Sequence, residues 1–402
     1  MIPTTFLTME DFPRTPNGKI DRKALPLPGT HGRNVAIVEP RSEAEQALKE
    51  IWKSVLGVDN IGIHDNFFDI GGNSILSIRI FARIAEKFNV HLPLSALFTE
   101  TTIEKLAARI TEQKETNKSW PVLVPIQING SKPPFFAVHG IGGGVGYRDL
   151  SNSLGNDQPL FGLQAVGQDG QEAFDVSIEA MASRYIRAMR SQQPHGPYRI
   201  GGYCFGGLIA YEMACQLEEM GEQVSTLAIF EGTLAHEVDT SVPFSHRLHA
   251  FRQNLLAWIR DYASMPSHQL FTRIRSTFAK VLMKFQRNPE LDRRVRVEET
   301  LGIDAQHIPQ KNKELLDIHM QAALDYAPNP YNGRVNLFRA RTRSFNEVVF
   351  GSLDPQMGWG ELAKGGVQVH LVDGFHRNMH LAPYVSSLAA ELKKCLDHEI
   401  YD

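Results

Sequence analysis

A cysteine lies within a glycine-rich segment of the sequence, where residues 201–207 read GGYCFGG. The segment follows an apolar stretch typical of a strand and precedes one typical of a helix. Flanking glycines permit the sharp strand-to-helix turn that raises a nucleophile above a sheet, and the helix dipole stabilises a thiolate there. We therefore predict that Cys204 is a nucleophile, against the alternative of a glycine-rich turn that holds a small buried cysteine.

A second glycine-rich segment lies earlier in the chain, where residues 139–144 read HGIGGG after an apolar stretch at residues 135–138. In enzymes with such a nucleophile, the loop after an earlier strand supplies backbone N–H groups that stabilise a tetrahedral intermediate. We expect the N–H groups of Ile141 and Phe205 to form this oxyanion hole. A flexible turn would account for the glycines but not for their position.

The general base must be chosen from fifteen histidines. His376 is favoured because it follows the last apolar strand and an Asp-Gly turn, and His380, at the start of a helix, is the alternative. The acid that orients the imidazole stays open between two carboxylates. Glu231 ends the strand after the nucleophile's helix, and Asp354 follows the next strand, so both belong to the same edge of a parallel sheet. A solvated surface carboxylate is the competing interpretation of either residue.

A further candidate site lies near the amino terminus, where residues 65–74 read DNFFDIGGNS. Two glycines let the backbone turn closely, and Ser74 begins a helix. Because a helix N-terminus accepts phosphate charge, this hydroxyl suits an attached phosphodiester. An ordinary serine N-cap explains the same pattern equally well.

The elements that must position these residues fall into two groups. Over residues 40–114, apolar residues recur at helical spacing, with helices expected over Glu43–Leu56, from Ser74 and from Thr101, which predicts a small all-α domain. From Pro121 onward, strands alternate with helices, which predicts a mostly parallel sheet with helices on both faces. Its strands are expected at residues 135–138, 198–201, 225–230, 334–338 and 367–372.

Three other segments complete the expected organisation. Residues 115–121 form a short polar linker that reaches roughly 20 Å when extended, so the two groups stay close. Residues 244–327 are helical and basic and lie between two strands, which is typical of a lid. The proline-rich residues 1–35 have too few apolar side chains to fold alone, and we interpret them as the tail of an upstream domain.

The composition restricts the class of protein. The chain has 402 residues, enough for roughly two to three domains, and its net charge of -3 implies neither a nucleic acid nor an anionic membrane surface as partner. We expect no secretion signal and no membrane span, because no apolar stretch approaches about 20 residues. The three cysteines form no CxxC pair and no metal-binding spacing, so we expect a cytoplasmic protein without a metal site.

Together these segments resemble the end of a nonribosomal peptide synthetase. Residues 66–74 resemble the attachment motif of peptidyl carrier proteins, which implies 4'-phosphopantetheine bound covalently to Ser74. Residues 15–22, TPNGKIDR, resemble the last core motif of an adenylation domain, whose catalytic lysine would match Lys19. The region from Pro121 resembles the type I thioesterase domains that terminate these synthetases.

The resemblance implies a fold, a division into domains and a set of partners. The fold is a small all-α four-helix carrier domain followed by an α/β-hydrolase domain, which has a mostly parallel sheet and a helical lid insertion. The domains are an adenylation remnant with linker at 1–35, a carrier domain at 36–115 and a thioesterase domain at 121–402 with its lid at 233–327. The partners are a phosphopantetheinyl transferase, the upstream condensation and adenylation domains, and a peptidyl thioester.

The implied activity is release of a carrier-bound peptide by hydrolysis, cyclisation or aminolysis, through an acyl-enzyme on Cys204 with His376 as base and Glu231 as acid. The family usually has serine at the position of Cys204 and aspartate at that of Glu231, so Asp354 stays an alternative acid. Lys19 has no adenylation site to serve and is expected to be inert. The competing class is a non-catalytic carrier-docking scaffold, or an engineered Ser-to-Cys protein that only traps an acyl group.

Overall fold

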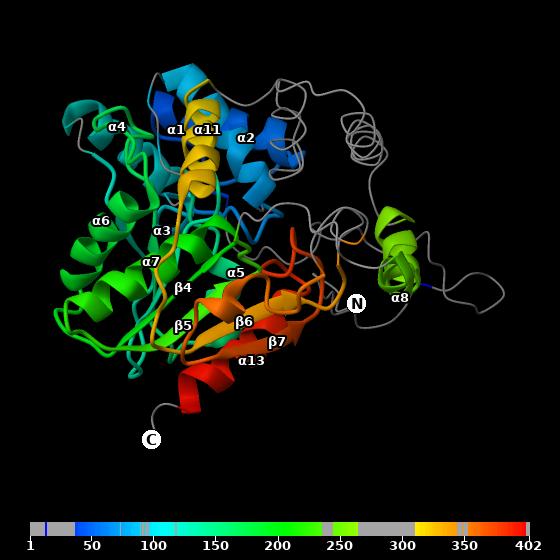
Figure 1. The fold of residues 1–402 in the computed structure, drawn as a ribbon. Coiled ribbons are helices and arrows are strands. Elements are labelled where there is room, and N and C mark those ends of the chain that lie inside the picture. The colour runs from blue at the N-terminus through cyan, green and yellow to red at the C-terminus, as the bar shows by residue number, and fades with distance from the viewer. Residues whose placement is uncertain are drawn as a thin grey trace.

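The structure of the chain is a computed structural model, whose helices and strands are drawn in Figure 1. The described residues are 13, 37–72, 74–88, 90, 92, 96–116, 119–234, 244–263, 310–343, 348 and 353–398. The expected adenylation remnant with Lys19, and most of the expected lid, therefore lie outside the described residues.

The amino-terminal part is a small helical unit. Its helices are α1 (Glu43–Leu56), α2 (Ser74–Phe88), the short α3 (Ala96–Thr99) and α4 (Ile103–Thr116). α1 begins where the Ser42 side chain accepts the Glu45 N–H, and it ends at Gly57, whose φ of 70° favours glycine. Apolar side chains of these helices and their loops share one core, in which the fully buried residues include Leu48, Trp52, Phe67, Ile84 and Leu106.

The carboxyl-terminal part is built on one seven-stranded sheet in the order β1-β3-β2-β4-β5-β6-β7. The strands are β1 (Leu123–Gln127), β2 (Phe135–Val138), β3 (Leu160–Leu163), β4 (Tyr198–Tyr203), β5 (Val224–Phe230), β6 (Val335–Ala340) and β7 (Val367–Val372). β1 pairs antiparallel with β3, and every other neighbouring pair is parallel. The expectation of a mostly parallel sheet is therefore confirmed.

Two of these strands, β1 and β3, are not among those expected from the sequence. Both are short, and they contain Pro125 and Gly162, residue types that are rare inside strands. β1 lies at the edge of the sheet, where proline is tolerated. Gly162 leaves room for Val145, because a Cβ atom at this glycine would overlap the valine side chain.

Helices cover both faces of the sheet (Figure 1). α6 (Ile178–Arg190) and α7 (Phe205–Glu219) pack together and share one core with the sheet. α5 (Arg148–Leu154) and α13 (Val385–His398) pack together and share a second core with it. α7 is buried nearly all round because both the sheet and α6 pack against it. The strands and the loops that follow them are thus held between two apolar layers.

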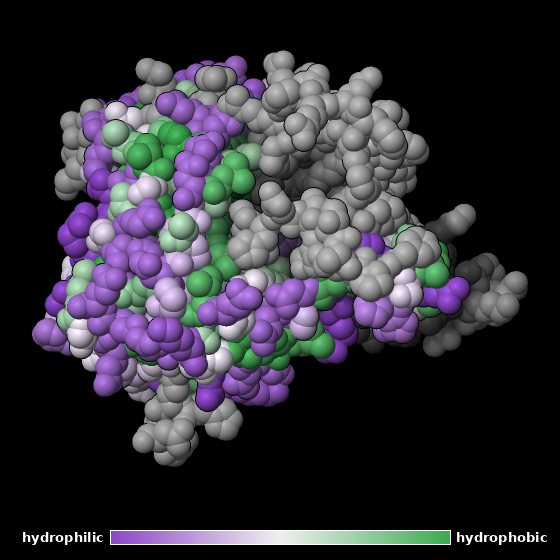
Figure 2. Space-filling model, viewed as in Figure 1, coloured by the Kyte–Doolittle hydropathy of each residue, from purple (hydrophilic) through white to green (hydrophobic). Residues whose placement is uncertain are grey.

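Two described helices belong to the segment between β5 and β6. α11 (Gln310–Asp325) packs on α7, and α8 (Phe244–Ala263) is held by the Trp258 indole N–H, which donates to the Arg343 carbonyl. Figure 2 shows hydrophilic and hydrophobic residues side by side on α8, whose exposed apolar side chains are Leu248, Leu255, Leu256 and Ile259. No described helix, α8 included, is long and apolar enough to span a bilayer. The role of this segment as a lid stays a prediction.

The joint between the two parts is shorter than the linker expected at residues 115–121. α4 extends to Thr116, inside the expected linker. Trp120 is already buried, and its backbone N–H donates to the Asp169 side chain at 2.7 Å. The chain is therefore fixed to the sheet part almost as soon as it leaves the helical part.

Candidate active site

Cys204 lies in the turn between β4 and α7, at the carboxyl edge of the sheet. Its backbone has a φ of 54° and a ψ of -113°, and non-glycine residues rarely adopt such a positive φ. Two hydrogen bonds hold the turn: the Cys204 N–H donates to the Phe230 carbonyl at 2.8 Å, and the Gly207 N–H donates to the Cys204 carbonyl at 2.9 Å. The cysteine is therefore held in a strained elbow directly before the first turn of α7.

The glycines on either side of Cys204 are required by the packing. A Cβ atom at Gly202 would overlap the backbone of Gly206. A Cβ atom at Gly206 would in turn overlap the carbonyl oxygens of Val138 and His139. The first turn of α7 thus lies against the end of β2, where the expected oxyanion loop begins. The cysteine turn and that loop are adjacent in the fold.

A histidine and a carboxylate meet at the same edge of the sheet. His376 Nδ1 lies 3.2 Å from Glu231 Oε2. Glu231 directly follows β5 and is 4% exposed, and its other oxygen accepts the Ala340 N–H at 2.5 Å. A carboxylate that is bound at both oxygens has a fixed orientation, and it can therefore fix the tautomer and the direction of the imidazole.

Asp354, the alternative acid, binds its own loop. Its two carboxylate oxygens accept the backbone N–H groups of Gln356 and Gly358. Because the carboxylate that contacts His376 is Glu231, the geometry favours Glu231 as the acid.

The His376 imidazole also lies close enough to Cys204 for the cysteine side chain to influence its pKa. Burial alone would lower the pKa of His376. The Tyr203 and Cys204 side chains, together with the hydrogen-bonded carboxylate, outweigh burial and raise this pKa well above its ordinary value. Such surroundings favour the protonated form of the His376 imidazole. Cys204, His376 and Glu231 thus lie in one cluster at the carboxyl edge of the sheet.

Two tyrosines support this cluster. The Tyr203 hydroxyl donates to the His376 carbonyl at 2.5 Å, and its ring lies 5.1 Å from the imidazole. The Tyr147 hydroxyl accepts the Tyr203 N–H at 2.9 Å and donates to the Val138 carbonyl at 2.5 Å. These bonds connect the ends of β2 and β4 to the loop that carries the histidine. Sequence reasoning missed both residues, and the position of Tyr203 beside Cys204 is the one available signal.

His380, the alternative base, is in a different environment. Its ring lies 4.3 Å from the Tyr203 ring, and its Nδ1 is buried without a hydrogen-bond partner in the described part of the chain. Burial lowers the pKa of His380 to about 4, and the nearby His376 adds to this effect. His380 is therefore neutral at pH 7, and among the described residues no carboxylate accepts a hydrogen bond from its Nδ1.

The expected oxyanion donors lie on the two segments that the glycine contacts bring together. Phe205 is the first residue of α7, so its N–H has no acceptor inside the helix. Ile141 lies in the loop after β2, against which the first turn of α7 packs. This placement supports the expectation that both N–H groups serve one oxyanion.

A histidine from the segment between β5 and β6 contacts both of these segments. His319, on α11, is fully buried, and its Nδ1 accepts the Gly142 N–H at 3.3 Å. Its ring stacks 4.6 Å from the Phe205 ring and 5.2 Å from the His139 ring. Burial lowers the pKa of His319 well below its ordinary value, so the ring is neutral and Nδ1 can accept. No sequence pattern marks this residue.

The expected attachment serine, Ser74, begins α2, a helix of 15 residues. The turn before the helix requires glycine: Gly71 has a φ of 102°, and a Cβ atom at Gly72 would overlap the Phe67 carbonyl and ring. The Gly72 N–H donates to the Phe67 carbonyl at 2.9 Å and closes the turn. A phosphodiester at the N-terminus of α2 would be stabilised by the helix dipole. The residues present therefore fit a phosphopantetheine attachment.

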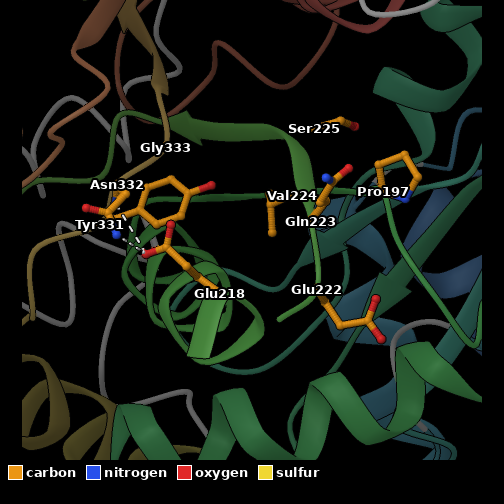
Figure 3. A pocket seen from close by; sticks show the side chains of 9 residues that line it. All are labelled: Pro197, Glu218, Glu222, Gln223, Val224, Ser225, Tyr331, Asn332 and Gly333. Atoms are coloured by element: carbon orange, nitrogen blue, oxygen red, sulfur yellow. Dashed lines mark hydrogen bonds between the residues drawn. The ribbon is translucent and has the colours of Figure 1, made fainter. Parts of the chain in front are cut away.

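A hollow of about 340 Å³ lies at the opposite edge of the sheet (Figure 3). Its lining includes Pro197, Val224 and Gly333, which begin or precede strands, and the carboxylates of Glu218 and Glu222. Ligands of parallel sheets bind at the carboxyl ends of the strands, so this hollow is separate from the candidate active site. Among the described residues, no group of three His, Cys, Asp or Glu side chains is arranged to hold a metal ion.

Two domain families match the chain. The thioesterase domain family matches residues 133–394, which include all strands except β1. The family of phosphopantetheine attachment sites matches residues 46–110, which include Ser74. The two matches divide the chain as the two parts of the fold do.

The chain is also similar to parts of long synthetases. It is 31% identical over 391 residues to malpibaldin synthetase of Mortierella alpina, a match that covers 94% of this chain and 6% of that protein. It is 39% identical over 241 residues to the dimodular nonribosomal peptide synthase of Bacillus subtilis (strain 168), covering 59% of this chain and 10% of that protein. The chain thus spans a small part of the length of these relatives.

One solved structure matches nearly the whole chain. It is a crystal structure of a four domain nonribosomal peptide synthetase in its holo form, bound to AMP and glycine. The match has a TM-score of 0.52 and 26% sequence identity, and it covers 98% of this chain and 29% of the other. The arrangement of a helical part followed by a sheet part is therefore found in a solved synthetase.

Proposed function

Because the chain belongs to the thioesterase domain family and carries a phosphopantetheine attachment site, we propose that it releases a thioester-bound peptide from its carrier domain through an acyl-enzyme on Cys204. The observation that supports this proposal is that His376 contacts the buried Glu231 and lies close enough to Cys204 to interact with it electrostatically. The thioesterase domain is proposed over residues 121–402, with a lid at 233–327.

The first half of the reaction transfers the acyl group to the enzyme. The Cys204 thiolate attacks the thioester carbonyl, and formation of the new carbon–sulfur bond turns the carbonyl oxygen into an oxyanion. The N–H groups of Ile141 and Phe205 donate hydrogen bonds to that oxygen. As the intermediate collapses, the bond to the leaving thiol breaks and His376 gives the leaving sulfur its proton. Glu231 holds the imidazole in place throughout.

The second half of the reaction releases the acyl group. His376, now neutral, takes a proton from the incoming nucleophile as it attacks the acyl-enzyme carbonyl. The same two N–H groups stabilise the second oxyanion, and Cys204 leaves as a thiolate beside the imidazolium. The nucleophile decides the product: water gives hydrolysis, an amine gives aminolysis, and a group on the peptide itself gives cyclisation.

Ser74 is the proposed attachment residue of a carrier domain over residues 36–115. When bound there, 4'-phosphopantetheine supplies the thiol that carries the peptide as a thioester. Ser74 provides the covalent link, and the N-terminus of α2 stabilises the phosphate charge. A phosphopantetheinyl transferase is the partner that would install the group, and upstream condensation and adenylation domains would supply the peptide.

The attachment can be tested by intact mass. A phosphopantetheinyl transferase with coenzyme A should add one phosphopantetheine to the chain, and Ser74→Ala should abolish the added mass. Ser54→Ala, an exposed serine of the same helical unit, is the matched control and should still be modified. An added mass that survives in Ser74→Ala would refute the site.

The catalytic role can be tested with a soluble acyl-pantetheine thioester. An enzyme consumes many equivalents, a carrier-docking scaffold consumes none, and an acyl trap stops at one acyl group per chain. Product analysis with a peptidyl thioester then separates hydrolysis from cyclisation and aminolysis.

The cysteine itself has an expected chemical purpose. An acyl-thioester is more electrophilic toward amines than an oxoester, and a thiolate leaves more readily than an alkoxide. Cys204→Ser should therefore release product more slowly, with a larger share of hydrolysis or a long-lived acyl-enzyme. A serine variant with the native rate and product ratio would remove this explanation of the cysteine.

A further inference from the structure

A contact between a cation and an aromatic ring connects the helical part to the sheet part. The guanidinium carbon of Arg148 lies 3.9 Å from the centre of the Phe68 ring. Phe68 belongs to the loop that leads to Ser74, and Arg148 is the first residue of α5, directly after the loop that carries Ile141. The contact therefore joins the segment before the attachment serine to the segment after an expected oxyanion donor.

The loop of the helical part holds Phe68 in a fixed position. The preceding residue, Phe67, is fully buried, and its N–H donates to the Thr101 carbonyl at 2.8 Å. The Phe68 N–H donates to the Asn66 side chain at 3.0 Å. Phe67 anchors the loop in the helical core, so the half-buried Phe68 ring is presented to Arg148 without a large loss of conformational freedom.

The residues on either side of Arg148 are anchored beside the candidate active site. The residue before it, Tyr147, binds the N–H of Tyr203, which precedes the nucleophile. The residue after it, Asp149, accepts the Ala382 N–H at 3.1 Å, in the carboxyl-terminal loop that also carries His380. Arg148 thus lies between two side chains that bind the nucleophile turn and the histidine loop.

The charges at this contact are complementary. Burial lowers the pKa of Arg148, and the carboxylates of Asp69 and Asp149 oppose that effect. A guanidinium stays charged at neutral pH even so. One loop of the helical part therefore offers Arg148 both an aromatic face, from Phe68, and a negative charge, from Asp69. A planar guanidinium stacks on an aromatic ring better than an ammonium does.

We propose that Arg148 is the residue by which the thioesterase domain recognises the attachment loop of its own carrier domain, through Phe68 and Asp69. The inference rests on the proposed function, since it concerns delivery of the acyl group from Ser74 to Cys204. Docking at Arg148 places the attachment loop beside the strand ends that hold the nucleophile.

The test compares two substrates of the full chain: an acyl group loaded on the carrier, and a soluble acyl-pantetheine thioester. Loading is completed and checked by mass before each assay. We measure the single-turnover rate constant for loss of the carrier-bound acyl group and compare it with the turnover rate of the soluble thioester. The ratio of these two rates should fall about fivefold in Arg148→Ala and in Phe68→Leu. The decrease in this ratio should be smaller in Arg148→Lys. Arg190→Ala, an arginine that pairs with Glu222 at the opposite edge of the sheet, is the matched control and should not change the ratio.

A second measurement needs no loaded carrier. Arg148→Ala should raise the radius of gyration of the chain in small-angle X-ray scattering, because the two parts separate more often. The double variant with Phe68→Leu should be no more affected than the stronger single variant, since both changes remove one contact.

Three results would overturn the proposal: equal slowing of both substrates, an unchanged radius of gyration, or additive effects in the double variant. If the loaded chain without substitutions consumes neither thioester, this result would contradict the proposed function instead. The scattering measurement would still decide the docking contact in that case.

Discussion

Among the described residues, the sheet part contains two clusters of a cysteine, a histidine and a glutamate. One is the candidate active site. In the other, His370 on β7 lies 3.5 Å from Cys395 Sγ through Nε2 and 3.6 Å from Glu391 Oε2 through Nδ1. The residue types are the same, and the histidine–glutamate distances are 3.2 Å and 3.6 Å, so composition alone does not distinguish the clusters.

The difference between the clusters lies in the backbone and the charges. Cys204 precedes the first turn of a helix, whereas Cys395 lies in the last turn of α13, where the helix dipole disfavours a thiolate. The pKa of His376 is raised by its neighbours, whereas burial lowers the pKa of His370. The expected oxyanion donors, the N–H groups of Ile141 and Phe205, belong to segments beside the first cluster. Position in the fold, and not the set of side chains, therefore marks the site.

Substitution of the cysteine in each cluster should give the largest difference in kcat between the two clusters. Cys204→Ala should lower kcat for an acyl-pantetheine thioester by a factor on the order of 10⁶, as loss of a nucleophile does elsewhere. Cys395→Ala should change kcat by less than roughly twofold. Steady-state assays of the two purified variants measure this, and comparable losses in both would contradict the comparison.

The carboxylates give the next largest contrast. Glu231→Gln should lower kcat on the order of 10⁴-fold, because the imidazole loses its orienting anion. Glu391→Gln should leave kcat within roughly twofold. Asp354→Asn should behave like Glu391→Gln, and a larger loss in Asp354→Asn than in Glu231→Gln would move the acid to Asp354.

His319 tests whether the oxyanion loop needs support from the segment between β5 and β6. His319→Phe keeps a ring against Phe205 but removes the acceptor of the Gly142 N–H, and it should lower kcat about tenfold with little change in KM. His319→Asn retains an acceptor and should restore most of the rate. Equal losses in both variants would indicate a packing role without a positioning role.

Titration of the two histidines should give the smallest but most direct contrast. In proton NMR spectra, His376 should titrate above its ordinary pKa and His370 below it. The folded chain then binds fewer protons at His370 than the unfolded chain, so stability is lost as the pH falls from about 6.5 through the folded pKa. For His376 the sign is opposite: its contribution is present below about 6.5 and is lost as the pH rises through the folded pKa.

Thermal unfolding between pH 5 and pH 8 checks these signs. His370→Gln should lose less stability than the native chain on acidification. His376→Gln should be more destabilised relative to the native chain at low pH than at high pH. Parallel stability curves for all three proteins would contradict both directions.

The sequence predicts that Cys204, Glu231 and His376 lie at one edge of the sheet because each follows a strand with a strong apolar pattern, although it leaves Asp354 open as the acid. Parallel strands bring such residues to one edge, and the glycines around Cys204 mark the turn. His319 and Tyr147 are not predictable in this way, because their roles depend on how distant segments pack. β1 and β3 escape prediction for a local reason: Pro125 and Gly162 are atypical of strands and are tolerated only because of their surroundings.

The contact between Arg148 and Phe68, which joins the two parts of the chain, is not predictable from the sequence either. Phe67 and Phe68 are adjacent and identical in type, yet one fills the helical core and the other meets Arg148. No periodicity separates the two residues, because the loop that contains them is irregular. The contact emerges only when both parts of the chain are placed together.

The short joint before Trp120 has a consequence for how tightly the carrier domain needs to bind. A partner held on a short tether has an effective concentration on the order of millimolar at its binding surface. A contact as weak as that of Arg148 with Phe68 is then enough to populate the docked state. The same weakness lets the helical part leave the docked position and return to it, so low intrinsic affinity is compatible with rapid, repeated delivery.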